Sequence, residues 1–237
     1  MNTQVAVGPV ISRALEIYGK RVGLLLGMAA LVLIPAGLIQ YLLQQAGGLG
    51  SALGSIVQFA AAALYAGAVV RVVQAENQGS EPGSIGEILG SVSDRIWPLI
   101  WVGIVAGIGT FFGFLLLIIP GIVLLVWWSV FQPAIVVEKI SFESLGRSRA
   151  LVKGHGWNVL GIGLVLFLLV LVIGLGSVLI GGVIGGGVGA AVVAIALGIF
   201  LIPVDGLVRS VLYFALLGQP VGEGVAPPPP PPPAPAA

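Results

Sequence analysis

Continuous apolar stretches constrain this chain more than any other feature of its sequence. Several run for about twenty residues without charge and without polar–apolar alternation. Of the 237 residues, 58% are hydrophobic and 8% are charged, whereas about a quarter of a typical soluble domain is charged. In lipid every backbone polar group needs an internal partner, which leaves helices and closed barrels. Because the stretches are continuous, we expect an all-α fold, a polytopic transmembrane helical bundle.

The apolar stretches divide into six expected spans, each near the length that crosses about 30 Å of hydrocarbon. The uncharged segment up to Val137 is long enough for two crossings, and Pro120-Gly121 is the expected turn between them. The spans are roughly Val22–Leu43, Ile56–Val73, Trp97–Ile119, a fourth from there to Val137, Trp157–Ile180 and Val188–Val204. They define a transmembrane domain over residues 1–217. The segment 218–237 is proline-rich and is expected to be a disordered cytoplasmic tail.

All ten lysines and arginines lie on one side of this map. They are Arg13, Lys20, Arg21, Arg71, Arg95, Lys139, Arg147, Arg149, Lys153 and Arg209. The other connections, near Gln44–Ser55, Pro120-Gly121 and Gly181–Gly189, carry no charge. Basic residues in short loops stay in the cytoplasm, because moving one across the bilayer costs several kcal/mol. We therefore expect a multi-pass protein with both termini in the cytoplasm.

The charged connections also carry apolar residues at helical spacing, which predicts three interfacial amphipathic helices. Their apolar residues are Ile11, Leu15 and Tyr18, then Ile85, Leu89 and Val92, then Phe142, Leu145 and Val152. Ser84 and Ser141 are the expected N-caps. The first two helices align at a constant offset, as Ile11/Ile85, Leu15/Leu89 and Arg21/Arg95. We expect a three-fold internal repeat, each unit being one interfacial helix followed by two spans.

The connection between the fourth and fifth spans has the densest basic surface. Its candidate residues, for a lipid headgroup or for structural contacts, are Glu138, Lys139, Arg147, Ser148, Arg149, Lys153 and Trp157. A basic residue near an anionic leaflet contributes roughly 1 kcal/mol of attraction. Glu138 is expected to cap its helix or to pair with Arg147 or Arg149. Asp205 and Arg209 are four residues apart and are expected to form an intramembrane ion pair.

Residues 115–162 resemble the membrane domain found beside some bacterial glycerophosphodiester phosphodiesterases. The resemblance is carried by Ile119-Pro120-Gly121, Pro133, Val136, Glu138, Leu145, Arg147-Ser148, Leu151, Gly154, Trp157 and Gly161, and by Pro203 with Val211-Leu212-Tyr213. It implies a stand-alone bacterial inner-membrane domain. It does not imply catalysis, because the phosphodiesterase barrel of that family is a separate soluble domain with its own histidines and carboxylates.

These observations favour a non-enzymatic accessory or scaffold protein that interacts with membrane lipids, with a membrane protein partner or with a second copy of itself. The sequence has no basic stripe for nucleic acid, no cysteine and one histidine, His155, so we expect no nucleic-acid partner, metal or other cofactor. A small transporter or channel is the first alternative, and its polar path would use Thr110, Ser129 and Gln132. A membrane enzyme acting on lipids is the second, and it would need Glu138, His155 and Asp205 to converge.

Overall fold

The computed structural model describes residues 6–218, and every regular element within them is a helix. The all-α expectation is therefore confirmed. The backbone of the last helix is described throughout, but the side chains at 173, 177, 181, 182, 184–197, 199 and 200 are not. The expected proline-rich tail lies outside the described residues apart from Gly218.

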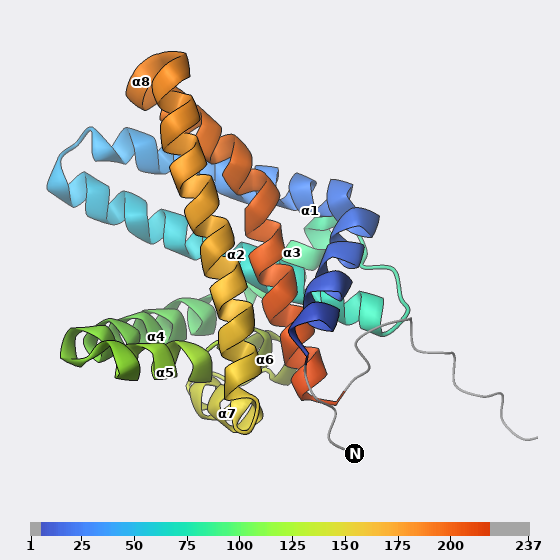
Figure 1. Cartoon of the computed structure of the whole chain (residues 1–237). Coiled ribbons are helices and arrows are strands. Elements are labelled where there is room, and N and C mark those ends of the chain that lie inside the picture. Colours follow the sequence, from blue (N-terminus) through green and yellow to red (C-terminus); the bar gives the residue numbers. More distant parts are fainter. Residues whose placement is uncertain (1–5, 219–237) are drawn as a thin grey trace, which may run out of the picture.

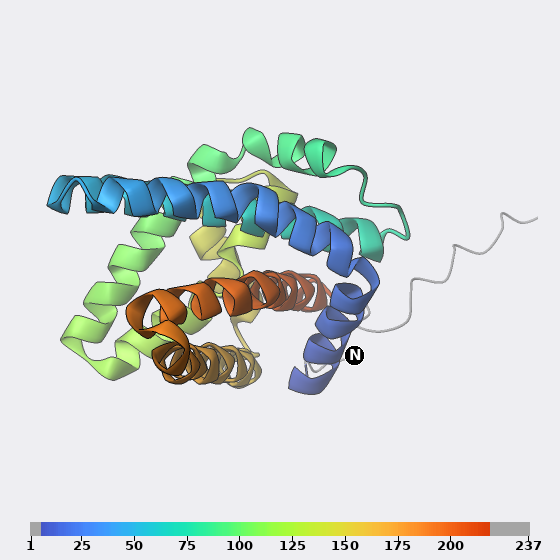
Figure 2. The same cartoon turned by 90° about the horizontal axis from the view of Figure 1, so that it is seen from above.

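The first two helices, α1 (Val7–Gln44) and α2 (Gly48–Asn77), form an antiparallel hairpin (Figure 1). Helix α1 bends at Arg21, whose φ of −119° and ψ of 22° are not helical. Figure 2 shows the N-terminal arm of α1 turning away from the rest of the helix. The bend falls where the sequence predicted the first span to begin. Gly54 allows the hairpin arms to approach closely, because a Cβ there would lie 3.0 Å from the Gln40 Cα.

A short helix, α3 (Ile85–Ser93), begins at Ser84, whose hydroxyl accepts from the Glu87 N–H while the Glu87 carboxylate accepts from the Ser84 N–H. This reciprocal capping box is the N-cap that the sequence predicted. The capping contact also lowers the pKa of the Glu87 carboxyl, because Ser84 donates a hydrogen bond to its charged form. Helix α3 buries Ile88 and Val92 and exposes the opposite face.

The second hairpin joins α4 (Ile96–Leu116) to α5 (Ile118–Trp127) through the single extended residue Leu117. The prediction of a turn at Pro120-Gly121 is therefore wrong. Pro120 lies in the first turn of α5, where a residue without an N–H loses no helical hydrogen bond. Gly113 and Gly121 face each other across the hairpin, since a Cβ on Gly113 would lie 3.0 Å from the Gly121 Cα.

The chain leaves helical geometry at Trp128–Val130 and continues as α6 (Phe131–Glu138) and α7 (Glu143–Val152). Residue Phe142, not Ser141, is the N-cap of α7, and its side chain makes no capping hydrogen bond. The face of α7 that packs against the protein consists of Ser144, Ser148 and Val152. Phe142, one of the apolar residues expected on the amphipathic helix, is 56% exposed. Two serines therefore pack against the protein.

The last helix, α8 (Gly156–Leu216), folds back on itself, so that its two arms run side by side (Figure 1). Five helical segments in the described part are long and apolar enough to cross a membrane, namely Val7–Gln44, Gly48–Asn77, Ile96–Leu116, Ile118–Glu138 and Gly156–Ile180. The expected sixth span, Val188–Val204, falls mostly on the arm of α8 whose side chains are not described. The architecture is that of a multi-pass membrane protein.

Two groups of buried residues hold the helices together. The larger group joins α1 and α2 to both arms of α8, with further members from α3, α6 and α7. It includes Tyr65, whose hydroxyl donates to the Leu25 carbonyl at 3.3 Å. The smaller group joins α2, α3, α4 and α6 around Val92 and Leu99. The tip of the α4–α5 hairpin is different, because residues 115–119 are between 67% and 76% exposed and all apolar. Such a surface is costly in water and suits contact with lipid.

Candidate functional site

Glu138, the last residue of α6, joins three helices through its carboxylate. The Arg147 Nε of α7 donates to both carboxylate oxygens, at 2.8 and 3.0 Å. The Tyr213 hydroxyl of α8 donates to Oε1 at 2.8 Å, and Tyr213 is buried. The hydrogen bond and charge of Glu138 raise the pKa of Arg147. The sequence predicted Arg147 or Arg149 as the partner of Glu138, and in the structure the partner is Arg147.

Ser148 of α7 holds the helix break between α5 and α6. Its side-chain oxygen donates to the Trp127 carbonyl at 2.7 Å and accepts from the Val130 N–H at 3.2 Å. A break in a helix leaves backbone groups without intrahelical partners, and a buried group of that kind is costly. Ser148 is fully buried, so its one hydroxyl satisfies both sides of the break.

Arg209 of α8 also contacts the break between α5 and α6. Its Nε donates to both oxygens of Asp205, at 2.8 and 3.0 Å, so the ion pair expected from their spacing forms. Its Nη1 donates to the Ser129 carbonyl at 3.4 Å. That carbonyl lies four residues before Pro133, which has no N–H to offer it. Arg209 therefore supplies a donor where the proline removes one.

Together these contacts fasten α6 at both ends, and we call them the α6 clamp: Ser148 and Arg209 at its start, Arg147 and Tyr213 at its end. Lys139 ends α6 in the left-handed conformation, with φ of 57°, and its carbonyl accepts from Arg95 Nη1 at 3.2 Å. The sequence did not indicate that Tyr213 and Arg95 would take part.

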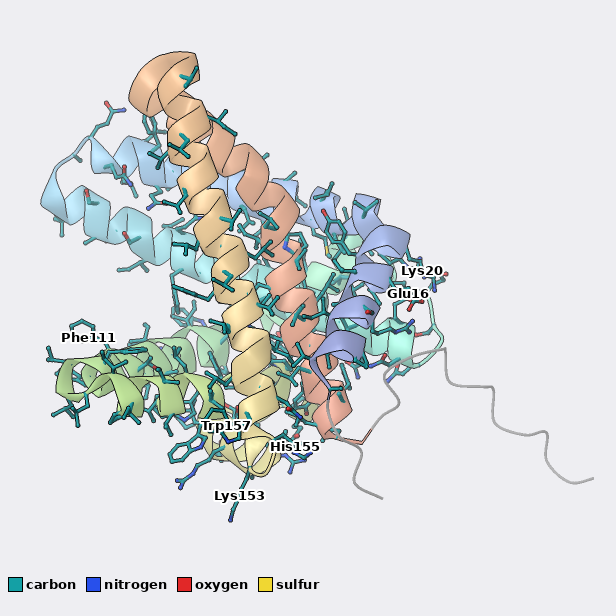
Figure 3. The ribbon with its side chains drawn as sticks, viewed as in Figure 1. Glu16, Lys20, Phe111, Lys153, His155 and Trp157 are labelled. Atoms are coloured by element: carbon teal, nitrogen blue, oxygen red, sulfur yellow. The ribbon has the colours of Figure 1, made fainter. Side chains whose placement is uncertain are left out.

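The remaining candidate residues form a separate surface, the basic face, which consists of Lys139, Arg149, Lys153 and Trp157. All four side chains belong to exposed residues, and Trp157 is 86% exposed. The Arg149 guanidinium lies 4.1 Å from the centroid of the Trp127 ring, a cation–π contact. In Figure 3, Lys153 points away from the bundle, at the end of the molecule where Trp157 also lies. None of the three basic residues forms a salt bridge within residues 6–218.

The three residues required by the enzyme alternative have the following surroundings. Glu138 and Asp205 are each bonded to an arginine, and His155 Nδ1 is buried without a partner among the described residues. Of the residues proposed for a transport path, Ser129 has a buried hydroxyl with no described partner.

A second charged cluster was missed by sequence reasoning. The Glu76 side chain is 4% exposed and accepts from Lys20 Nζ at 2.8 Å and from Arg21 Nε at 2.6 Å. Arg21 also donates to Glu81, at 2.6 Å, and lowers the pKa of that exposed carboxyl. The cluster lies at the bend of α1. One signal could have revealed it, since Glu76 and Glu138 both follow a long apolar stretch.

Comparison with family models, with curated proteins and with solved structures finds no match to this chain. The resemblance of residues 115–162 to a phosphodiesterase-associated membrane domain stays a prediction.

Proposed function

We propose that this protein is a non-enzymatic, six-span protein of the bacterial inner membrane whose basic face binds anionic lipid headgroups. In this role it acts as an accessory or scaffold for lipids or for a membrane partner. One observation carries the proposal. Glu138 pairs with Arg147, and Glu143 accepts from the Ser141 N–H, whereas Lys139, Arg149 and Lys153 form no salt bridge with a carboxylate among the described residues. An anion from outside the chain would complete their charge balance.

The electrostatic attraction of the basic face to an anionic leaflet is expected to be large enough to affect binding. At about 1 kcal/mol for each basic residue near an anionic leaflet, the three together contribute about 3 kcal/mol. An exposed tryptophan beside them favours the boundary between headgroups and hydrocarbon, because its ring is amphipathic. Trp157 therefore supports placing the basic face at that boundary.

We further propose that residues 7–20, α3 and α7 lie along the cytoplasmic boundary and begin three repeated units. Leu15 and Phe142 support this, because they are 51% and 56% exposed although apolar, as expected for side chains that contact lipid. The arginine after each of the first two such helices contacts the end of its unit's second span. Arg21 holds Glu76, and Arg95 holds the Lys139 carbonyl, in each case at the end of the unit's second span.

Native mass spectrometry of the purified full chain tests the headgroup proposal, with phosphatidylglycerol as the probe. The wild type should retain this lipid through mild activation. The triple variant K139Q/R149Q/K153Q should bind it about a hundredfold more weakly, from the loss of about 3 kcal/mol. R13Q is the control, because Arg13 already pairs with Glu16 on α1. Equal retention by the triple variant and R13Q would refute the assignment.

A further inference from the structure

Arg71 is a partly buried cation without a counterion in the described part of the chain. It lies near the end of α2, and its Nη1 donates to the Gln74 Oε1 at 2.9 Å. Its Nε is buried and has no acceptor among the described residues, and no carboxylate forms a salt bridge with it there. The positive charge of Arg95 acts on it as well. A buried cation with these neighbours is unfavourable unless an anion joins it.

An open cavity of about 390 Å³, lined in part by Arg71, lies between α2, the loop after it and α3. Its polar lining residues are Arg71, Gln74, Gln78, Glu87 and Ser91. The volume lies within the usual range for small-ligand sites. Because Gln74 uses its oxygen to accept from Arg71, its amide nitrogen is free to donate to a bound anion.

The charged residues that line the cavity also indicate which ligand charge it favours. Glu87 Oε2 accepts from the Ser84 N–H at 2.8 Å, so this carboxylate is held by the N-cap of α3. One guanidinium and one carboxylate on the same cavity favour an anion with a single negative charge over one with several. A phosphodiester has that charge, and its two free oxygens can accept hydrogen bonds from the Arg71 guanidinium and from the Gln74 amide.

We propose that this cavity, the Arg71 cavity, binds one phosphate group carrying a single negative charge. Arg71 and the Gln74 amide are the donors. The group belongs either to a phospholipid headgroup or to a free phosphate compound, and both present the same oxygens to the site. The Arg71 cavity shares no residue with the basic face, so the site goes beyond the proposed function and does not depend on it.

Isothermal titration calorimetry of the full chain in dodecyl maltoside tests the site, with short-chain phosphatidylglycerol and inorganic phosphate as the two probes. The variant R71Q should bind about tenfold more weakly or worse, since hydrogen bonds to a charged group are lost. S91F should weaken binding equally by filling the cavity. Ser91 is exposed, and its hydroxyl bonds only to the Ile88 carbonyl, so S91F preserves folding if R71Q does not.

The matched control is R13Q, which removes one charge that already pairs with Glu16 on α1 and leaves both the basic face and the Arg71 cavity intact. It should keep the Arg71-dependent binding. Displacement of the lipid by inorganic phosphate would identify free phosphate as a ligand, and failure of displacement would assign the site to lipid headgroups; either result supports the site. Wild-type protein that binds neither probe, or R71Q and S91F that fold and bind both probes like the wild type, would overturn it.

Discussion

The Tyr213 hydroxyl donates to Glu138 Oε1 at 2.8 Å, although the two residues are 75 positions apart. Glu138 ends α6, and Tyr213 is buried near the end of α8. The same carboxylate accepts from Arg147 of α7, so one side chain connects three helices. The contact gives the hydroxyl of the buried Tyr213 side chain a hydrogen-bond partner at the edge of the apolar core.

Removing the Tyr213 hydroxyl should loosen this junction. We expect Y213F to lower the free energy of unfolding by about 1–2 kcal/mol, because a hydrogen bond to a charged group is lost while the aromatic packing stays. Thermal unfolding in detergent measures the change. Y41F is the control, since Tyr41 is 62% exposed. Identical melting temperatures for Y213F and Y41F would contradict the role given to this hydroxyl.

The two buried serines of α7 provide a matched pair. Ser148 satisfies both sides of the helix break, whereas Ser144 is equally buried and its hydroxyl has no partner among the described residues. We expect S148A to destabilise the protein by about 1–3 kcal/mol, because the Trp127 carbonyl and Val130 N–H are left unpaired. S144A should be neutral or slightly stabilising. Chemical unfolding curves in mixed micelles distinguish the two, and equal losses would show that Ser148 is only a packing residue.

The sidedness of the membrane map can be measured directly, because the native chain has no cysteine. Ser80 and Gln45 are both exposed, in the linker after α2 and at the tip of the α1–α2 hairpin respectively. We expect Q45C to react with a membrane-impermeant maleimide on intact cells, and S80C to react only after permeabilisation. The opposite labelling pattern would invert the topology and move the basic face to the outer leaflet.

The cluster at the bend of α1 should contribute to stability mainly through its buried member. We expect E76Q to lower the free energy of unfolding by about 2–3 kcal/mol, since Lys20 and Arg21 lose their shared carboxylate. E81Q removes an exposed carboxylate from the same arginine and should cost much less. Differential scanning calorimetry of the two variants provides the comparison. A larger loss in E81Q than in E76Q would show that the exposed contact dominates.

Local features of the fold could be predicted from the sequence. The helices follow from apolar stretches that must satisfy their own backbone in lipid. The Ser84 N-cap has its partner Glu87 three residues away, and the Asp205–Arg209 pair spans one helical turn. In each case the residues that decide the geometry lie within about one turn of helix.

Only the tertiary structure decided which surfaces meet. Apolar spacing did not indicate that Ser148 would lie on the face of α7 that packs against the protein. The α5–α6 break presents unpaired backbone groups to that face, and Ser148 satisfies them better than an apolar side chain could. The contacts of Glu76 with Arg21 and of Glu138 with Tyr213 likewise form only when helices that are distant in sequence lie together. Apolar periodicity reports that a face avoids water. It does not report whether lipid or protein covers that face, because both media are apolar and the specific hydrogen bonds form only when the helices pack.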